Sequence, residues 1–104
     1  MAREKFKTLT EQMFYVLLCL QKELCGMDIL ELVPKLTDGR VTVGSGTLYH
    51  LLDDFLLEGM IRETKVEGRK RSYRITEKGR AMLDDEARRL RAQVRDYDTL
   101  MKED

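Results

Sequence analysis

Residues 47–75, TLYHLLDDFLLEGMIRETKVEGRKRSYRI, decide the fold. Apolar residues follow helical spacing up to Gly59, and this glycine can end a helix because it readily adopts the left-handed conformation. Two strand-like segments follow, residues 60–66 and 71–75, and Glu67-Gly68 supplies the turn between them. The stretch therefore predicts a helix followed by a β-hairpin.

Two more helices are predicted before this stretch. Thr8 and Glu11 have the spacing of a capping box, so the first helix should begin after Thr8 and continue to about Leu24. Apolar residues cover more than one side of this helix, and such a surface needs partners on several sides. The second helix should begin near Asp28, and Pro34 should end or kink it.

The connection to the third helix is short. Val41-Thr42-Val43 predicts a very short strand, and Gly44-Ser45-Gly46 predicts a flexible approach to the helix. Two short helices joined in this way, the second of them amphipathic, are typical of a helix-turn-helix.

A last helix should begin at Thr76, after the hairpin, with Gly79 as an unfavourable residue in its first turns. Its apolar positions are spaced by alternating steps of four and three residues, which is the seam of a coiled coil. We expect this seam to form a dimer rather than to pack back on its own domain. The seam consists of Leu83, Ala87, Leu90, Val94, Tyr97 and Met101.

The positive charge is concentrated on the predicted hairpin. The chain of 104 residues has 19 basic and 19 acidic side chains, and its length fits one domain. Residues 60–80 nevertheless carry eight basic and three acidic groups. Because a local field governs attraction to a polyanion, the zero total does not exclude nucleic acid as a partner.

The cysteine spacing and the hydropathy of the sequence predict a cytoplasmic protein. Cys19 and Cys25 have neither a redox-motif nor a metal-ligand spacing, and Cys19 lies in an apolar run that predicts a buried thiol. No signal peptide opens the chain, and the longest apolar run, Met13 to Leu20, is far too short for a membrane span. We expect a reduced cytoplasmic protein with no membrane partner.

The order helix, helix, helix, hairpin, helix predicts a DNA-binding protein. A helix of the helix-turn-helix pair can enter the major groove, and a basic hairpin can lie along the neighbouring phosphates. The alternative for any run of charge is a solvated face, but here the run directly follows a helix-turn-helix pattern. The predicted fold is therefore mainly α with a small β-hairpin: a winged helix-turn-helix followed by a C-terminal dimerisation helix.

Several short motifs support this prediction by their combination. They are Gly26-Met27-Asp28-Ile29-Leu30, Gly46-Thr47-Leu48-Tyr49, Leu51-Leu52, Glu58-Gly59-Met60-Ile61 and the run from Gly68 to Arg80. In this order and spacing they resemble the PadR family of bacterial transcriptional regulators over roughly residues 10–84. The length and the single helix after the hairpin resemble the short subfamily.

The resemblance implies a homodimeric regulator, usually a repressor, that binds double-stranded DNA at a palindromic operator. It implies that the first and last helices build the dimer interface. We therefore expect residues 1–76 to form the DNA-binding domain and residues 77–104 the C-terminal dimerisation helix. Residues 45–50 would begin the recognition helix and residues 68–71 the tip of the wing. Some members of the family release DNA when a small hydrophobic or phenolic effector binds between the subunits.

Asp53 and Asp54 depart from the family pattern, because many relatives have basic residues in the middle of the recognition helix. Carboxylates facing phosphate would repel it, so base recognition is expected at the helix N-terminus, whose dipole also favours phosphate. Position 50, often Pro in relatives, is His here. Tyr49 could instead belong to the core, and His50 is expected to be a surface residue rather than a metal ligand. The predicted DNA-binding set is Arg40, Ser45, Thr47, Tyr49, His50, Lys65, Arg69, Lys70, Arg71, Tyr73 and Arg74.

A second set is predicted for the dimer interface or an effector pocket, although packing alone would also explain its side chains. No tryptophan is present, so the drug stacking seen in some short relatives cannot be carried over. The set is Met13, Phe14, Leu17, Leu90, Val94, Tyr97 and Met101.

Other classes of function find little support. No nucleophile with an adjacent base, no metal-ligand cluster and no phosphate-binding glycine loop is present, so we expect neither an enzyme nor a cofactor. The alternative function is a winged-helix protein-interaction module without operator binding.

Overall fold

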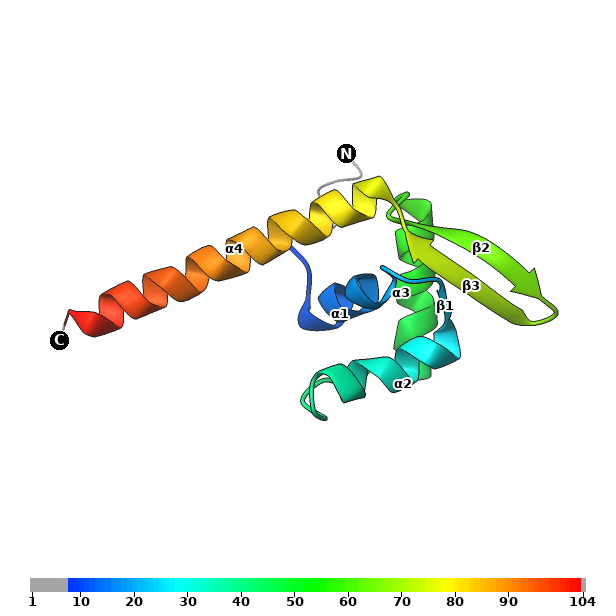
Figure 1. Cartoon of the computed structure of the whole chain (residues 1–104), viewed down its shortest axis with the longest axis horizontal. Helices are drawn as coiled ribbons and strands as arrows, with labels where there is room; N and C mark the ends of the chain where they lie inside the picture. The colour runs from blue at the N-terminus through cyan, green and yellow to red at the C-terminus, as the bar shows by residue number, and fades with distance from the viewer. Residues whose placement is uncertain (1–7, 104) are drawn as a thin grey trace.

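The computed structural model describes residues 8–103 and confirms the predicted fold class. Residues 1–7 and 104, at the ends of the two predicted domains, lie outside the described residues. Within this range, no helix has the length and hydropathy needed to cross a membrane. The elements are α1 (Glu11–Cys19), β1 (Leu24–Cys25), α2 (Gly26–Leu36), α3 (Ser45–Leu57), β2 (Ile61–Glu67), β3 (Lys70–Ile75) and α4 (Glu77–Lys102) (Figure 1).

Helix α1 is shorter than predicted at both ends. Thr10, not Thr8, caps it: the Thr10 hydroxyl accepts a hydrogen bond from the Met13 amide at 3.2 Å. Leu9 lies in the core and is 8% exposed, which fixes the chain one residue before the cap. The helix ends at Cys19 rather than near Leu24.

The early end of α1 follows from a strand that the sequence did not predict. Leu24 pairs with Tyr73 and Cys25 with Ser72, so β1 adds a third strand to the hairpin. The Ile75 amide also donates to the Leu20 carbonyl at 2.8 Å. These long-range hydrogen bonds outweigh the local helical spacing of Leu20 and Leu24.

Helix α2 begins two residues earlier than expected, at Gly26. The Asp28 carboxylate accepts hydrogen bonds from the amide and the thiol of Cys25, both at 3.2 Å. These hydrogen bonds lower the pKa of Asp28. Pro34 lies in the last turn, and α2 ends two residues later at Leu36, so the helix ends near the proline as predicted.

The predicted strand at Val41-Thr42-Val43 does not form. Val41 and Val43 are buried in the core, but the Thr42 carbonyl accepts a hydrogen bond from the Gln12 side chain at 3.0 Å. The Thr37 hydroxyl donates to the Val33 carbonyl at 2.9 Å and accepts from the Val41 amide at 3.0 Å. Side chains therefore hold this connection in place of a strand neighbour.

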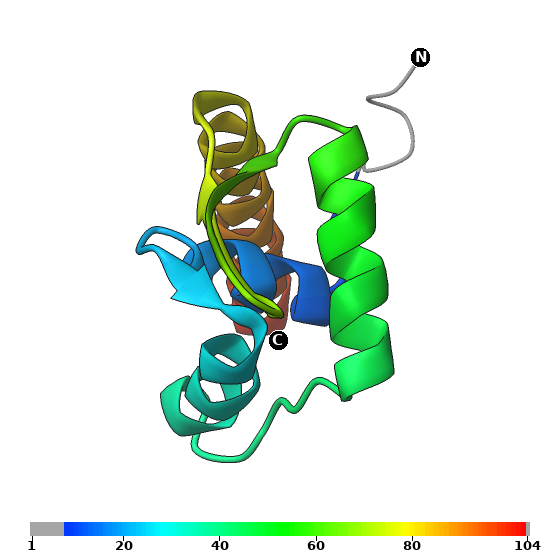
Figure 2. The ribbon, with the colours of Figure 1, turned by 90° about the vertical axis from the view of Figure 1, so that its right-hand side faces the viewer.

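Helix α3 includes Ser45 and Gly46, as the family resemblance implied, although the glycine pattern alone predicted a flexible approach there. Its buried face consists of Leu48, Leu51, Leu52 and Phe55. Gly59 has a φ of +73°, which confirms its role as the residue that ends the helix. Figure 2 shows α3 standing beside the sheet, with α2 at the lower left of the view.

The three strands form an antiparallel sheet in the order β1-β3-β2. Gly68 and Arg69 turn between β2 and β3, one residue later than predicted, and Gly68 has a φ of +63°. A positive φ at the first turn residue is what a type II′ hairpin requires. Thr64 interrupts the pairing between Glu63 and Lys65.

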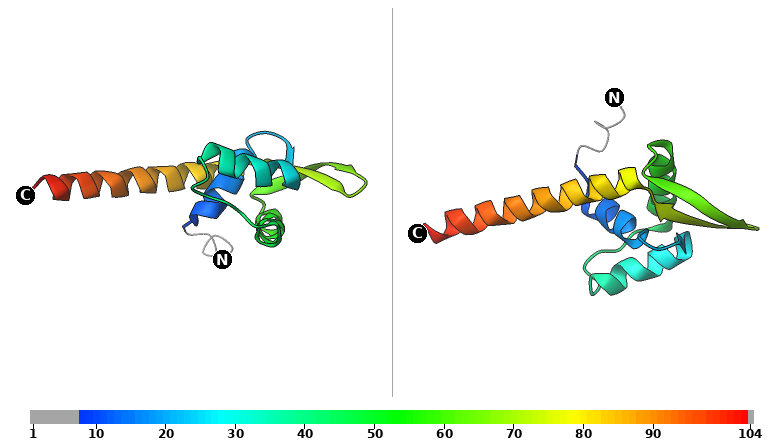
Figure 3. Two further views of the ribbon diagram at one scale, coloured as in Figure 1. Left: turned by 90° about the horizontal axis from the view of Figure 1, so that it is seen from below. Right: turned by 45° about the horizontal axis from the view of Figure 1, so that its top comes forward.

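Helix α4 begins at the predicted place, where the Thr76 hydroxyl accepts from the Gly79 amide at 3.1 Å. Gly79 is required there, because a Cβ at this position would lie 2.1 Å from the Met60 carbonyl oxygen. Leu83 and Glu86 are also buried, and Arg89 pairs with Glu86 and lowers its pKa. Beyond these turns α4 extends away from the body, opposite the wing (Figure 3).

Candidate nucleic-acid interface

The first turns of α3 present polar side chains to solvent. Ser45, Thr47, Tyr49 and His50 are exposed, whereas Leu48 is fully buried. Because consecutive helical residues point about 100° apart, burying Leu48 leaves its neighbours on the outer and lateral faces. Hydroxyl, phenol and imidazole groups are thus gathered at the positive end of the helix dipole.

Tyr49 is held against the start of α2. Its ring lies so close to Gly26 that a Cβ there would be 2.6 Å from the Tyr49 hydroxyl oxygen. The side chain is nevertheless 46% exposed. Gly26 therefore allows the Tyr49 ring to pack against α2 while a large part of the side chain remains exposed.

The wing presents different charges on its two faces. Cross-strand partners share a face of the sheet, and alternate residues along a strand do the same. Arg62 faces Arg74 on one side, while Glu63 faces Tyr73 on the other. The second face is the one that Ile61 and Ile75 bury toward the core. Arg74 therefore lies on the face opposite to Tyr73 and α3.

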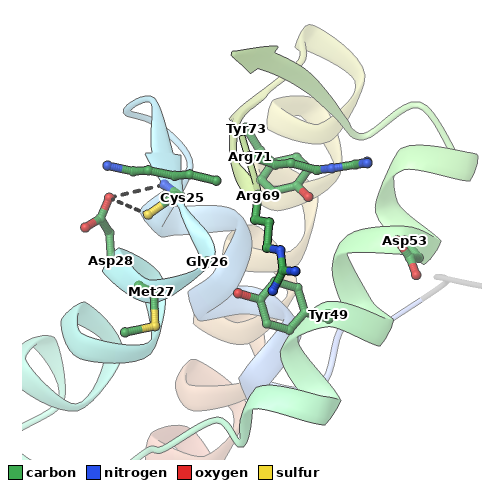
Figure 4. Close-up of a pocket in the computed structure, with 10 residues that line it drawn as sticks. Cys25, Gly26, Met27, Asp28, Tyr49, Asp53, Arg69, Arg71 and Tyr73 are labelled. Atoms are coloured by element: carbon green, nitrogen blue, oxygen red, sulfur yellow. Dashed lines mark hydrogen bonds between the residues drawn. The ribbon is translucent and has the colours of Figure 1, made fainter. Parts of the chain in front are cut away.

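Several wing cations have carboxylate partners. Arg71 pairs with Glu63 at 3.3 Å, and Lys65 pairs with Glu67 at 3.6 Å. Arg69 forms no ion pair within residues 8–103. Its side chain extends from the wing tip toward Tyr49 (Figure 4). The tip thus keeps a cation without a carboxylate partner close to α3.

A cleft of about 740 Å³ lies between the wing tip, the start of α2 and one side of α3. It brings together Tyr49 of α3 with four predicted wing residues, so part of the predicted DNA-binding set lies around one space. The lining residues are Cys25, Gly26, Met27, Asp28, Tyr49, Asp53, Arg69, Lys70, Arg71 and Tyr73.

The two acidic residues of α3 have different environments. Asp53 is exposed and lines the cleft. The Asp54 side chain is only 18% exposed, and one of its oxygens lies 3.6 Å from His50 Nε2, where an ion pair forms when the histidine is protonated. Asp53 is therefore the carboxylate that faces the space between α3 and the wing.

Arg40 lies apart from the cleft and is bound to α1. Its guanidinium pairs with Glu11, donates to the Tyr15 hydroxyl at 2.9 Å and lies 6.0 Å from the centre of the Tyr15 ring. We call these three residues the Arg40 clasp. The clasp connects the segment before α3 to α1.

Leu17, predicted for the dimer interface, and Tyr73, predicted for DNA binding, are both buried in the structure. Leu17 has no exposed surface, because it lies at the centre of the core, so it cannot contribute directly to a dimer surface. Tyr73 is 5% exposed, because its ring packs into the core, and burial raises its pKa. Only its edge and hydroxyl can face the cleft.

The other residues of the second predicted set lie along α1 and α4. Met13 and Phe14 are partly buried, while Leu90, Val94, Tyr97 and Met101 are 38–63% exposed. Phe14 and Leu90 line a pocket of about 220 Å³ between the start of α1 and α4. Val94, Tyr97 and Met101 extend the exposed apolar stripe along α4 beyond that pocket.

Sequence reasoning missed the contribution of residues 25–28 to the cleft. The motif at Gly26 was noted, but its position next to the wing depends on β1, whose two residues carry no recognisable strand pattern. Among the described residues no cluster of His, Cys, Asp and Glu could hold a metal ion. Cys19 is buried as predicted, and burial raises its pKa to about 11.

The chain matches one protein-family model and no curated protein. The model of a family described as "Transcriptional regulator PadR-like family" matches residues 16–85.

Solved structures share the fold at low sequence identity. A PadR family regulator from Eggerthella lenta superposes with a TM-score of 0.73 at 18% identity, over 98% of this chain and 87% of that one. PadR of Bacillus subtilis, solved with operator DNA, gives 0.65 at 24% identity, over 75% and 47%. The adhesin competence repressor of Streptococcus pyogenes gives 0.60 at 16% identity, over 91% and 66%. The chain thus spans about half to two thirds of the latter two proteins.

Proposed function

Because the chain belongs to the PadR-like family of transcriptional regulators, we propose that it is a sequence-specific DNA-binding repressor that works as a homodimer. The family consists of regulators rather than enzymes. One observation carries the proposal: the exposed polar N-terminus of α3 lies beside a wing tip whose Arg69 has no carboxylate partner in the described chain. In this arrangement α3 enters the major groove, and the wing neutralises phosphates.

The roles of individual residues follow from their positions. Ser45, Thr47 and His50 face solvent at the start of α3 and are proposed to contact bases or the adjacent phosphates. Lys65, Lys70, Arg71 and Arg74 are proposed to act on the backbone and to contribute no sequence discrimination. A repressor of this kind acts on the chromosome, and the proposal therefore includes a cytoplasmic location.

The homodimer is proposed to form through α4 together with α1. Leu90, Val94, Tyr97 and Met101 leave an apolar stripe on a helix that extends beyond its own domain. Isologous pairing of such stripes produces a twofold dimer, and a twofold dimer matches a palindromic operator.

A small hydrophobic or phenolic effector is proposed to act near this interface. The pocket between α1 and α4 has aromatic and aliphatic walls from Phe14, Tyr15 and Leu90. Its volume of about 220 Å³ suits a small ligand or part of a larger one. Thermal unfolding of the protein with a panel of phenolic compounds would detect such a ligand by its stabilisation of the folded state.

Salt-dependent binding tests the main proposal. Fluorescence anisotropy with duplex fragments from the region upstream of the chain's own gene should show binding that weakens steeply as salt rises, because neutralised phosphates release counterions. Arg69→Ala with Arg71→Ala should weaken binding to all fragments and reduce the salt slope by about one for each phosphate that is no longer neutralised. Lys102→Met, at the far end of α4, is the matched control. No binding at low salt would contradict the proposal.

A protein-interaction module is the second candidate. The carboxylates of Asp28 and Asp53 in the cleft favour it, since both oppose a polyanion. In that case the wild-type chain would bind none of the fragments at low salt.

A further inference from the structure

The apolar stripe of α4 remains exposed along the part of the helix that extends away from the body (Figure 3). Its residues are spaced alternately by four and three positions, so they form one line along the helix, as in the seam of a coiled coil. They are Leu90, Val94, Tyr97 and Met101, and they are 38–63% exposed. A second copy of α4 could cover this stripe in either direction and in several registers, and the structure distinguishes between these arrangements.

The surface of α4 between Leu90 and Val94 is hollowed. The hollow has a volume of about 410 Å³, and Arg91 and Arg95 line it together with these two residues. An apolar surface with guanidinium groups beside it suits an aromatic side chain, because cations are attracted to the faces of aromatic rings. Tyr97 is the aromatic residue of the stripe and is 63% exposed. A second copy that brings its Tyr97 to the hollow would therefore cover both surfaces.

The two flanks of the stripe differ in charge. Arg91 and Asp98 lie on the same flank, because seven residues make nearly two helical turns, and both are exposed. Gln93 and Leu100 lie on the opposite flank and carry no charge. Among residues 8–103, neither Arg91 nor Asp98 forms an ion pair. One flank thus offers a cation and an anion that a partner could complement.

This charge pattern favours an antiparallel pair. In a parallel pair, the Arg91 flank of one helix faces the opposite flank of the other, where Gln93 and Leu100 are uncharged. The nearest carboxylate on that flank belongs to Glu86, which is buried and already paired with Arg89. In an antiparallel pair with twofold symmetry, equivalent flanks meet, so that arginine and aspartate can face each other.

The antiparallel registers differ in which charges meet. With the twofold axis near residue 92, Arg91 would face its own equivalent and Asp84 would face the partner's Asp98, so like charges would meet. Moving the axis by half a heptad, to a point between residues 95 and 96, brings Arg91 opposite the partner's Asp98. Symmetry forms this contact twice in the dimer. Charge therefore selects the second register.

The same register matches the apolar residues and the length of the helix. Leu90 lies opposite the partner's Met101, and Val94 lies opposite the partner's Tyr97, which thus reaches the hollow. Residue 103 lies opposite residue 88 of the partner, so each helix ends before the turns that Glu86 anchors to the body. The exposed part of α4 is then covered along its whole length.

We propose that two copies of α4 pair antiparallel about a twofold axis between residues 95 and 96. Arg91 pairs with the partner's Asp98, and the partner's Tyr97 occupies the hollow beside Val94. This arrangement rests on the proposed homodimer and adds the direction and the register of its interface.

Exchanging the two charges tests the register in the full chain. Arg91→Asp alone and Asp98→Arg alone each bring like charges together at two places, so the dimer dissociation constant from sedimentation should rise about tenfold. The chain with both substitutions restores opposite charges and should dimerise within about twofold of the wild type. Asp96→Arg makes the same change in net charge as Asp98→Arg, on the side of α4 away from the stripe, and should leave the dimer unchanged.

Disulfide cross-linking measures the direction independently. In the proposed register Leu90 lies opposite the partner's Met101, whereas the two copies of residue 90 lie about 16 Å apart along the helix axis, too far for a disulfide. Leu90→Cys chains mixed with Met101→Cys chains should therefore cross-link, and Leu90→Cys chains alone should not. The native Cys19 and Cys25 are buried and can remain in both variants.

The register and the homodimer can fail separately. Cross-linking of Leu90→Cys chains alone would indicate a parallel pair. A double charge variant that dimerises no more tightly than the single ones would show that Arg91 and Asp98 do not meet. Either result would overturn the register and leave the dimer, whereas a wild-type chain that sediments as a monomer would contradict the homodimer itself.

Discussion

At the scale of single residues, small side chains determine where functional ones can lie. Gly26 allows Tyr49 to pack against the start of α2, and Gly79 allows α4 to begin against the Met60 carbonyl. Both glycines were visible in the sequence. Neither of these close approaches could be predicted, because each joins segments that are distant in the sequence.

Asp53 is the residue whose effect on DNA binding is most direct to test. It is exposed and lines the cleft, so its carboxylate repels phosphate there. Asp53→Asn should raise DNA affinity about fivefold at low salt, the effect of removing one like charge in a solvated site. Asp98→Asn, on the exposed far part of α4, makes the same change in net charge and should have little effect. An unchanged affinity for Asp53→Asn would place the backbone away from this side of α3.

At the scale of elements, the sequence predicted those that local patterns specify. Helices α3 and α4 and the hairpin follow from apolar spacing, Gly59 and the Thr76 cap, and their bounds agree within about two residues. The errors occur where long-range contacts override local preference. The end of α1 is replaced by β1, and Val41 and Val43 are buried without forming a strand.

In the candidate site, too, local patterns predicted some features, while others depend on long-range contacts. The exposed start of α3 and the basic wing tip were predicted because helical spacing and charge mark them. The cleft depends on how β1 places residues 25–28 against β3, and no local pattern encodes that placement. Arg40 was placed in the predicted DNA-binding set, whereas its contacts in the structure are with Glu11 and Tyr15.

The Arg40 clasp leads to a prediction about the segment between α2 and α3. Arg40→Met and Glu11→Gln both break the ion pair, and Glu11→Gln leaves the cation in place. Amide hydrogen exchange in residues 38–43 should accelerate in both variants, because the segment is no longer connected to α1. The salt slope of DNA binding should stay the same in both.

A change in the salt slope would support the sequence-based prediction that Arg40 binds DNA. If Arg40→Met lowers the salt slope by about one and Glu11→Gln does not, Arg40 contacts a phosphate in the complex.

At the scale of the whole molecule, the shape is that of a body with one long projection. The principal extents are 59 × 34 × 21 Å, and the longest of them runs from the end of α4 to the tip of the wing. The first turns of α4 are anchored by Gly79, Leu83 and Glu86, while the apolar side chains after Leu90 remain largely exposed. Such a surface is unusual for a helix that stays alone in water.

Disrupting this surface should separate the proposed dimer. Leu90→Asp with Val94→Asp places charges in the stripe, and sedimentation should then give a single chain of 12.2 kDa. DNA affinity should fall as well, because two linked half-sites bind more tightly than one. Thr99→Asp adds a charge to α4 outside the stripe and should leave the dimer intact. A dimer that survives the double substitution would place the interface elsewhere.

The close fit of Gly79 against Met60 has a consequence for the spacing of the operator. Because α4 packs at Gly79 directly against the Met60 carbonyl at the base of the hairpin, we expect the helix and the wing to keep one relative angle. In the proposed dimer, the way two copies of α4 pair would then set the distance and rotation between the two recognition helices. The phase of the half-sites along the duplex, one helical turn or a multiple of it, would thus be determined by a helix that touches no base.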